Sequence, residues 1–299
     1  MNPFYKDYGE YLSEVFPNIK VQKLSIDAGF TCPNRDGTIG AGGCIYCNNS
    51  SFTPGYCNPD DTVTEQLEKG KIFFRRKYPE MKFLAYFQSY TNTFGRSSAD
   101  LLSMYRSASE GENVVGVIIG TRPDCIPDEL IDGIAELNVK TPVIIEIGAE
   151  TSFDSTLRLI NRNHTWTQVE DAVGRLTSKG IRCGLHLIAG LPGESDAEVL
   201  QTVEKASSLP IDSIKMHQLQ IIKDTPLHRK ILSGDIMVHP YSLDDYLNLC
   251  VRIVGLTPSH ICIERFLSSS PPEMVVAPKW GLKNYQFTNL LLNKLRSIR

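Results

Sequence analysis

Three cysteines near the N-terminus are the residues whose type and spacing point most directly to chemistry. Cys32, Cys44 and Cys47 follow the pattern C-x11-C-x2-C in the segment TCPNRDGTIGAGGCIYC, which contains no histidine. Three thiolates can hold three irons of a [4Fe–4S] cluster and leave the fourth iron open for another ligand. A cluster with an open iron can do chemistry as well as carry electrons. The spacing therefore predicts an iron–sulfur cluster with a free coordination position.

Two simpler interpretations of these cysteines stay open from the spacing alone. Cys57 lies not far beyond Cys47, so these four cysteines have the number of ligands that a structural zinc site needs. Zinc sites more often use two close pairs, and only Cys44 and Cys47 are close here. Burial without a ligand better suits the cysteines in apolar or isolated segments: Cys125, Cys183, Cys250 and Cys262. The glycines of the cysteine loop favour the cluster, because glycine lets the backbone approach an inorganic group closely.

The composition is that of an ordinary globular protein. The 299 residues include 41% hydrophobic and 22% charged side chains, with a formal net charge of −3. No apolar run approaches the roughly 18 residues of a membrane span, and the first residues do not resemble a signal peptide. We therefore expect a cytoplasmic protein without membrane contact, whose cysteines stay reduced. The net charge gives no global attraction to nucleic acid but leaves room for a local basic surface.

Short apolar segments alternate with segments of helical periodicity along most of the chain. The expected strands are Val21–Ala28, Phe83–Gln88, Val114–Thr121, Val143–Glu150, Arg182–Leu191 and Ser213–Ile222. The expected helices are Thr64–Tyr78, Ala99–Glu110, Asp128–Leu137, Thr167–Lys179 and Asp196–Ser208. This alternation predicts an α/β fold with a parallel sheet and right-handed crossovers. Six strands are too few for the eight of a closed TIM barrel.

The chain divides into three expected parts. Residues 1–20 form an N-terminal helical segment, residues 21–255 the core, and residues 256–299 a short C-terminal extension. Within the extension, Ile261–Ser270 can add an edge strand, and Asn284–Ile298 reads as a closing helix.

The cysteine loop resembles that of radical-SAM enzymes. Its long spacing is similar to the YhcC/YtqA-like group, distant relatives of the elongator-type radical-SAM proteins, whereas the commoner spacing is C-x3-C-x2-C. The resemblance continues through FQSYTNTF, TRPDCI, EIGAET, RNHT and GLPGES. It implies an open (β/α)6 partial TIM barrel and S-adenosylmethionine (SAM) on the open iron. One electron, from a donor such as flavodoxin or ferredoxin, then cleaves SAM into methionine and a 5′-deoxyadenosyl radical.

Polar residues follow several expected strands, where α/β barrels place their reactive groups. The resemblance assigns Gln88 and Ser89, after the second strand, to the SAM amino group; a polar loop that caps the next helix is the alternative. Glu146 and Glu150 lie on the same side of the fourth strand, because side chains alternate with period two. The resemblance suggests that this strand contacts the ribose or the amino acid part of SAM, and a structural ion pair is the alternative.

Further candidates come from the RNHT and GLPGES segments. Arg162 matches a position where an arginine approaches the SAM carboxylate in related enzymes. His164 is expected at the surface, capping a helix. His186 in the fifth strand and Gly190 in the following turn are the remaining candidate SAM contacts. No catalytic residue is assigned.

Other polar residues of the expected barrel remain ambiguous. Arg122 either pairs with a cofactor or substrate carboxylate or neutralises Asp124. Lys215, His217 and Gln220 interrupt the apolar sixth strand and are candidates for substrate or adenine contact.

Two basic clusters suggest RNA as the substrate. One expected helix carries Lys69, Lys71, Arg75, Arg76 and Lys77, and the C-terminal segment carries Lys279, Lys283, Lys294, Arg296 and Arg299. Trp280, Tyr285 and Phe287 are interleaved with the second cluster. Basic groups neutralise phosphates and aromatic faces stack on unpaired bases, although solvated helix surfaces are also commonly basic.

The resemblance points to the same substrate class. It implies a tRNA-modifying enzyme that converts a carboxymethylaminomethyl group on C5 of the wobble uridine to an aminomethyl group. A radical-SAM enzyme acting on a peptide or a small metabolite is one alternative. A non-catalytic, zinc-stabilised nucleic-acid-binding module is another.

Overall fold

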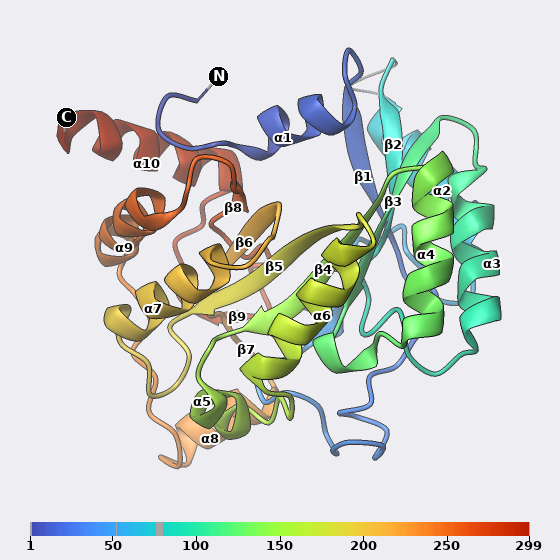
Figure 1. The fold of residues 1–299 in the computed structure, drawn as a ribbon. Coiled ribbons are helices and arrows are strands. Elements are labelled where there is room, and N and C mark those ends of the chain that lie inside the picture. The colour runs from blue at the N-terminus through green and yellow to red at the C-terminus, as the bar shows by residue number, and fades with distance from the viewer. Residues whose placement is uncertain (1, 52, 76–79, 299) are drawn as a thin grey trace.

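A parallel sheet of seven strands forms the centre of the molecule (Figure 1). The computed structural model describes residues 2–51, 53–75 and 80–298. The strands are β1 Val21–Ile26, β2 Lys82–Phe87, β3 Val114–Thr121, β4 Val143–Glu150, β5 Arg182–Ala189, β6 Ser213–Gln218 and β8 Cys262–Arg265. They pair in the order β1-β2-β3-β4-β5-β6-β8, and each pairing is parallel. This is the open partial barrel that the sequence predicts, with β1 and β8 at its two edges.

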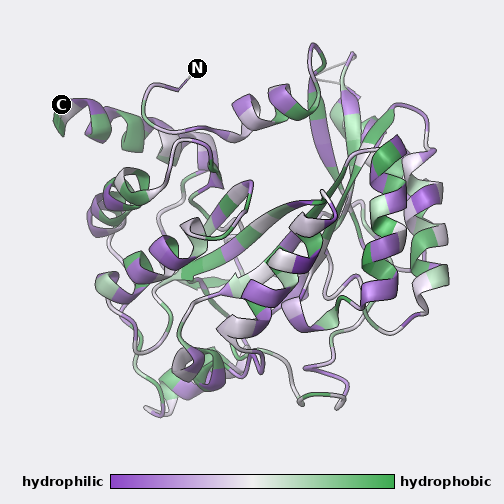
Figure 2. Ribbon diagram, viewed as in Figure 1, coloured by the Kyte–Doolittle hydropathy of each residue, from purple (hydrophilic) through white to green (hydrophobic). Residues whose placement is uncertain are grey.

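Helices lie in the connections between the strands. They are α2 Val63–Arg75, α3 Ser98–Ser109, α4 Asp128–Lys140, α5 Asp154–Leu159, α6 Trp166–Ser178 and α7 Asp196–Ser207. Two more, α8 Pro226–Leu232 and α9 Leu243–Leu256, lie between β6 and β8, while α1 Tyr8–Val15 precedes β1 and α10 Asn284–Ile298 follows the last strand. Hydrophilic and hydrophobic segments alternate along these helices in Figure 2, as they do in amphipathic helices with one face on a core. Ser195 and Glu198 form a capping box at the start of α7.

The sixth expected strand, Ser213–Ile222, is shorter in the structure than the apolar run that predicted it. β6 ends at Gln218, and Ile221–Ile222 form a separate strand, β7, which pairs antiparallel with β9 Val275–Ala277. The expected range Ser213–Ile222 therefore spans two strands of different sheets. The apolar run continues across the break, so periodicity alone does not show it. The expected helix Thr64–Tyr78 ends at Tyr78, which lies outside the described residues.

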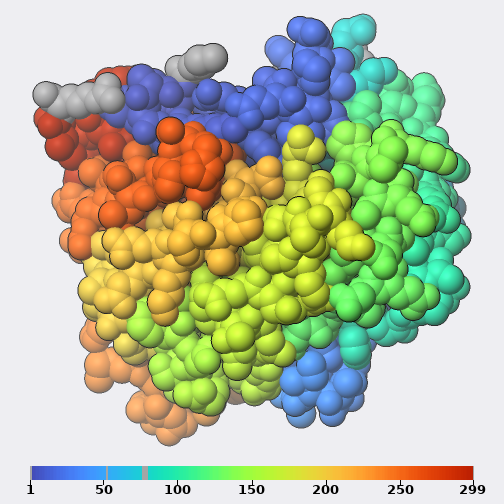
Figure 3. Space-filling model, viewed as in Figure 1, coloured from blue at the N-terminus to red at the C-terminus, as the bar shows by residue number. Residues whose placement is uncertain are grey.

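The N-terminal segment packs against the C-terminal part of the chain. In Figure 3 the blue N-terminal residues lie beside the orange and red C-terminal ones. The Ile263 N–H donates to the Lys6 carbonyl at 2.9 Å, and Asp7 forms a parallel bridge with Ile263. The chain before β1 therefore runs alongside β8. Among the described residues, no helix combines the length and the apolar character that crossing a membrane requires.

Candidate active site

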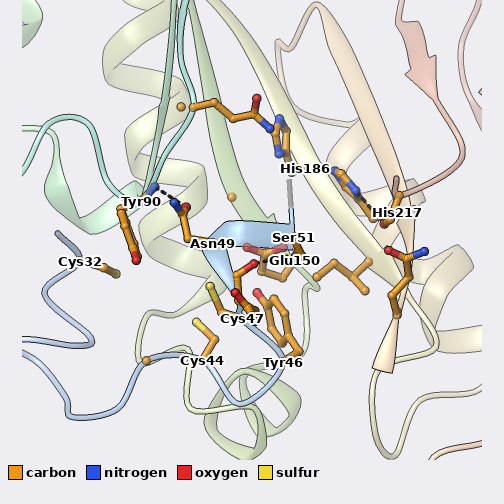
Figure 4. A pocket seen from close by; sticks show the side chains of 18 of the residues that line it. Cys32, Cys44, Tyr46, Cys47, Asn49, Ser51, Tyr90, Glu150, His186 and His217 are labelled. Atoms are coloured by element: carbon orange, nitrogen blue, oxygen red, sulfur yellow. Dashed lines mark hydrogen bonds between the residues drawn. The ribbon is translucent and has the colours of Figure 1, made fainter. Parts of the chain in front are cut away.

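A cavity of about 460 Å³ opens inside the barrel, next to the loops that follow the strands. Cys32, Cys44 and Cys47 line it. In Figure 4 these cysteines lie on one side of the cavity and His186 and His217 on the other. We call these two regions the cysteine end and the histidine end. The volume falls within the roughly 300–1,000 Å³ typical of sites for small ligands.

The cysteine loop is fixed by backbone hydrogen bonds to two other segments. The Ile45 N–H donates to the Ile160 carbonyl just after α5 at 3.0 Å, and the Leu227 N–H in α8 donates to the Ile45 carbonyl at 2.8 Å. The Cys47 N–H donates to the Cys44 carbonyl at 3.0 Å, which forms a turn between these two cysteines. The buried Ile45 side chain belongs to a small apolar cluster between α5 and α8. These contacts hold the loop at the cysteine end of the cavity.

The geometry does not support the four-cysteine zinc site. Cys57 points away from the cavity and its Sγ donates to the Ser25 carbonyl at 3.0 Å. In the part of the chain that the structure describes, no three His, Cys, Asp or Glu side chains converge as they must on a single metal ion. A [4Fe–4S] cluster makes no such demand, because each cysteine binds a different iron. Burial and the neighbouring Cys44 raise the pKa of the Cys47 thiol to about 12.

Arg162 and Glu150 face the cysteine end together. Arg162 Nη2 donates to the Gly148 carbonyl at 2.7 Å and lies 3.3 Å from Glu150 Oε1, while Nη1 lies 3.8 Å from Cys44 Sγ. Glu150 follows an irregularity in the pairing of β4 with β5 and has a φ of 66°. Burial disfavours the arginine charge, but Glu150 and Cys44 raise the pKa of Arg162 well above its usual value. A fixed positive charge beside a thiol is what a negatively charged, thiolate-bound cluster needs.

Two buried arginine donors at this end have no partner among the described residues. These are Arg162 Nε and Arg122 Nη1, and both arginines line the cavity. An orphaned buried donor costs free energy unless a ligand satisfies it. The two donors therefore fit an anionic ligand group at this end of the cavity.

Arg122 makes one of the two pairings that the sequence leaves open. Its Nε and Nη2 donate to the two carboxylate oxygens of Asp124 at 2.9 and 2.8 Å. This bidentate pair neutralises Asp124. The guanidinium is 1% exposed, so only Nη1 remains for another group.

The expectation of a surface position for His164 is wrong. His164 is 4% exposed, and its Nε2 lies 3.2 Å from the Gly148 carbonyl. Burial and the charges of Arg162 and Arg122 lower the pKa of His164 to about 3, so the ring is neutral. The RNHT segment lies against Gly148 of β4, and no pattern in the sequence indicates that Arg162 and Arg122 lie near His164.

The remaining sequence candidates divide into two groups. Gln88 and His186 line the cavity, and Gln88 Oε1 accepts from Ser25 Oγ at 2.9 Å. Ser89 and Gly190 are not among the described residues that line it. Ser89 is buried with its Oγ 3.4 Å from Thr53 Oγ1, and Gly190 packs against the ring of Tyr241.

A buried ionic network lies at the histidine end. Glu146 accepts from Tyr86 Oη at 2.7 Å, and its Oε2 lies 2.6 Å from His186 Nε2. Lys23 and Lys215 each form ion pairs with both Glu146 and Glu264, at 2.6, 2.9, 3.0 and 3.2 Å. Burial alone would raise the pKa of Glu146, but the two lysines hold it well below its usual value. We call these two lysines and two glutamates the lysine–glutamate network.

The sequence singled out Glu146 and Lys215 but missed their shared partners. Lys23 and Glu264 lie in the two edge strands β1 and β8. They meet at 2.9 Å only because the barrel curves to bring those edges together. Charged residues inside otherwise apolar strand segments were the available signal.

Two of the three aromatic residues of the C-terminal segment take part in packing, whereas Tyr285 is 62% exposed. Phe287 is fully buried, and the ring of Trp280 stacks on Tyr246 with centroids 5.4 Å apart. In the other basic cluster, Lys71 is buried and pairs with Glu68 at 2.6 Å. Arg76, Lys77 and Arg299 lie outside the described residues.

The fold and the site together define a partial-barrel protein with three cysteines at one end of an internal cavity, an arrangement that suits an iron–sulfur cluster. A family model described as the Radical SAM superfamily matches residues 34–206, and one described as the Radical_SAM C-terminal domain matches residues 211–297. The chain belongs to the radical-SAM superfamily. Members of this family use a [4Fe–4S] cluster and SAM, which the cysteine end fits.

Relatives are similar over most of their length. YtqA of Bacillus subtilis (strain 168) is 32% identical over 293 residues, covering 98% of this chain and 90% of YtqA. YhcC of Escherichia coli (strain K12) is 37% identical over 263 residues, covering 87% of this chain and 82% of YhcC. These similarities confirm the YhcC/YtqA-like group.

More distant similarities extend to proteins of the elongator type. A tRNA uridine(34) acetyltransferase of Methanocaldococcus jannaschii is 22% identical over 165 residues, covering 54% of this chain and 30% of that protein. The structure of Elp3 from Methanocaldococcus infernus superposes with a TM-score of 0.65 at 15% identity, covering 93% of this chain and 63% of that one. This structural likeness confirms the fold.

Proposed function

We propose that this radical-SAM enzyme modifies tRNA, converting a carboxymethylaminomethyl group on C5 of the wobble uridine to an aminomethyl group. The observation that carries the proposal is the two-ended cavity. The cysteine end suits the cluster and SAM, and the histidine end leaves room for a polar substrate group in the same enclosed space. The distant relative named as a tRNA uridine(34) acetyltransferase supports the same nucleotide.

The residues at the cysteine end have separate roles. Cys32, Cys44 and Cys47 hold the cluster, and Glu150, Arg162 and Gln88 bind SAM. When bound, SAM and the cluster supply the radical chemistry, with electrons from a donor such as flavodoxin or ferredoxin.

The net reaction removes the carboxymethyl group from the side-chain nitrogen. A hydrogen atom and then one electron leave the methylene carbon of that group. Water adds to the carbon–nitrogen double bond that results, and the carbon–nitrogen bond breaks with its electron pair staying on nitrogen. The products are the aminomethyl uridine and glyoxylate. SAM and the cluster, held by the residues of the cysteine end, would supply the capacity to accept this hydrogen atom and this electron, so that no further oxidant would be needed.

Mass spectrometry of tRNA nucleosides from a strain lacking the gene tests the proposal. We expect carboxymethylaminomethyl uridine to accumulate and the aminomethyl form to disappear. The parent gene should restore the parent pattern, whereas a gene carrying Cys44→Ala should not. An unchanged nucleoside pattern would leave a peptide or a small metabolite as the substrate of the radical-SAM enzyme.

A further inference from the structure

Arg265 is a cation at the histidine end that no protein group neutralises among the described residues. It is the last residue of β8, pairs in register with Lys215 of β6, and lines the cavity. Its Nε is buried without a hydrogen-bond partner, and no carboxylate of the described residues lies within ion-pair distance of its guanidinium. Arg122 and Arg162, the other arginines of the cavity with orphaned donors, both have carboxylate partners.

The neighbouring charges do not balance Arg265. The lysine–glutamate network contains two lysines and two glutamates, and each lysine pairs with both glutamates. The network is therefore neutral by itself. The adjacent histidines add no negative charge, and burial together with Arg265 lowers the pKa of His217 well below its usual value. One positive charge is left over at this end of the cavity.

Neutral hydrogen-bonding groups line the cavity together with this charge. Ser268, Ser270 and Gln220 line the same cavity. Ser270 Oγ donates to Gln220 Oε1 at 2.7 Å, which leaves the amide N–H groups of Gln220 as donors. His217 Nδ1 lies 3.1 Å from Ser268 Oγ. An unpaired cation among donors in a partly buried site is complementary to an anionic ligand group.

We propose that Arg265 binds the carboxylate of the substrate's carboxymethylaminomethyl group. This inference rests on the proposed function and names the residue that selects the acid. The carbon that loses hydrogen is bonded directly to the carboxylate. Anchoring the carboxylate at the histidine end therefore fixes the reacting carbon inside the cavity that also contains the three cysteines. Uridines without this acid lack the anchor.

Binding of two anticodon stem-loop RNAs to the cluster-loaded enzyme tests the proposal. The RNAs are identical except that one carries carboxymethylaminomethyl uridine and the other its uncharged carboxamide. The parent should bind the carboxylate RNA more tightly by roughly ten- to a hundredfold, the scale of one charge-assisted hydrogen-bonded pair. Arg265→Gln should weaken only the carboxylate RNA, so that the two dissociation constants become similar. Arg265→Lys keeps the charge and should retain part of the preference.

Arg252→Gln is the matched control, because Arg252 is exposed and pairs with Asp196 on the surface. It should keep the full preference, and absorbance should show the same cluster content in all variants. An Arg265→Gln variant that retains the parent's preference would overturn the inference. Equal weakening of both RNAs would also overturn it and assign Arg265 to a phosphate instead. Equal affinity of the parent enzyme for the carboxylate and carboxamide RNAs would be a third contrary result. This measurement does not depend on the folding of any variant.

The nucleoside pattern of the deletion strain separates this inference from the proposed function. A normal pattern there would overturn the function and, with it, the named substrate. An altered pattern combined with an unchanged preference in Arg265→Gln would overturn the carboxylate site alone.

Discussion

At the scale of single residues, the position of Cys57 separates the ligands of the cluster from the other cysteines. We expect Cys32→Ala, Cys44→Ala and Cys47→Ala each to abolish reductive cleavage of SAM, because three thiolates are needed to hold the cluster. Cys57→Ala is the matched control. It should leave SAM cleavage largely intact, because the Cys57 thiol donates a hydrogen bond to the Ser25 carbonyl in the parent. Iron and sulfide content and the yield of 5′-deoxyadenosine measure both effects. Equal damage from Cys57→Ala would mean that the ligand set is wrong.

Substitution of Arg162 or Glu150 should weaken SAM binding without lowering the cluster content of the protein. Glu150→Gln or Arg162→Ala removes a charged hydrogen-bonding group, a loss of about 1.5–3 kcal/mol in binding free energy. Calorimetric titration of the cluster-loaded variants with SAM measures it. Iron content should stay at the parent level, because neither residue is a cluster ligand. Parent-like SAM affinity in both variants would return the pair to a structural role.

The sequence was informative about residues with a characteristic spacing and less so about those defined by their surroundings. The three cysteines, Glu150 and Arg162 were identified from motifs, and the structure brings them to one end of a cavity. Arg265 was missed, because a charged residue in an edge strand normally faces solvent. The role of Arg265 depends on which charged residues lie near it in space, and these residues belong to strands that are far apart in the sequence.

At the scale of elements, the lysine–glutamate network links strands β1, β4, β6 and β8. Glu146→Gln should destabilise the fold by about 3–5 kcal/mol, the cost of breaking a buried ion pair from one side. Lys23 and Lys215 would then share Glu264 as their remaining carboxylate. Urea denaturation at pH 7 measures the change. Glu136→Gln, an exposed glutamate on α4, is the control and should have little effect.

The stabilising effect of Glu146 should depend on pH in a defined direction. Its pKa in the folded protein is below the usual 4.5, because the lysines outweigh the effect of burial. The unfolded chain therefore takes up the proton first as pH falls. The stabilisation is complete above about pH 5 and is lost as pH falls through the folded pKa. The denaturation midpoints of the parent and Glu146→Gln should approach one another progressively as pH falls below about 5, and a difference that stays constant below pH 5 would contradict this.

Elements were predictable where a local pattern specified them. Most of the six longest strands were visible as apolar runs because both of their faces are buried, whereas β1 is only half-buried at four of its six positions. The pair β7–β9 joins two and three residues that lie far apart in the chain, and no local pattern encodes such a pairing. Helix α9 is different, since Tyr246, Leu249, Cys250 and Ile253 are buried at helical spacing after the N-cap Ser242. That signal was present in the sequence and was overlooked.

At the scale of the whole molecule, RNA binding has to be reconciled with where the basic residues lie. Figure 1 shows α10 at the same end of the molecule as α1, away from α5 and α8, which hold the cysteine loop. Of its basic residues, Lys294 pairs with Asp244 at 2.5 Å, while Lys283, just before the helix, and Arg296 are exposed. An RNA that reaches both α10 and the cavity must extend along the barrel, as a whole tRNA can and a stem-loop cannot.

This arrangement predicts different behaviour for two RNA lengths. Replacing Lys283, Lys294, Arg296 and Arg299 with alanine should weaken binding of whole tRNA and lower the slope of log K against log salt by about 0.9 for each lost duplex phosphate contact. Binding of the anticodon stem-loop should change little, because it does not reach α10. Filter binding at several salt concentrations measures both slopes. A variant with Lys140, Lys179 and Lys205 changed to alanine controls for the loss of surface charge on other helices.

The substitution Trp280→Ala distinguishes packing within the protein from stacking on an RNA base in the same filter-binding assay. Because its ring stacks on Tyr246 within the protein, Trp280→Ala should lower the thermal midpoint and leave the tRNA salt slope unchanged. If the quadruple variant instead binds whole tRNA as tightly as the parent and with the same slope, α10 has no part in recognition. The RNA would then be held only by the surface around the cavity, where Arg265 and the neighbouring serines are the groups to test next.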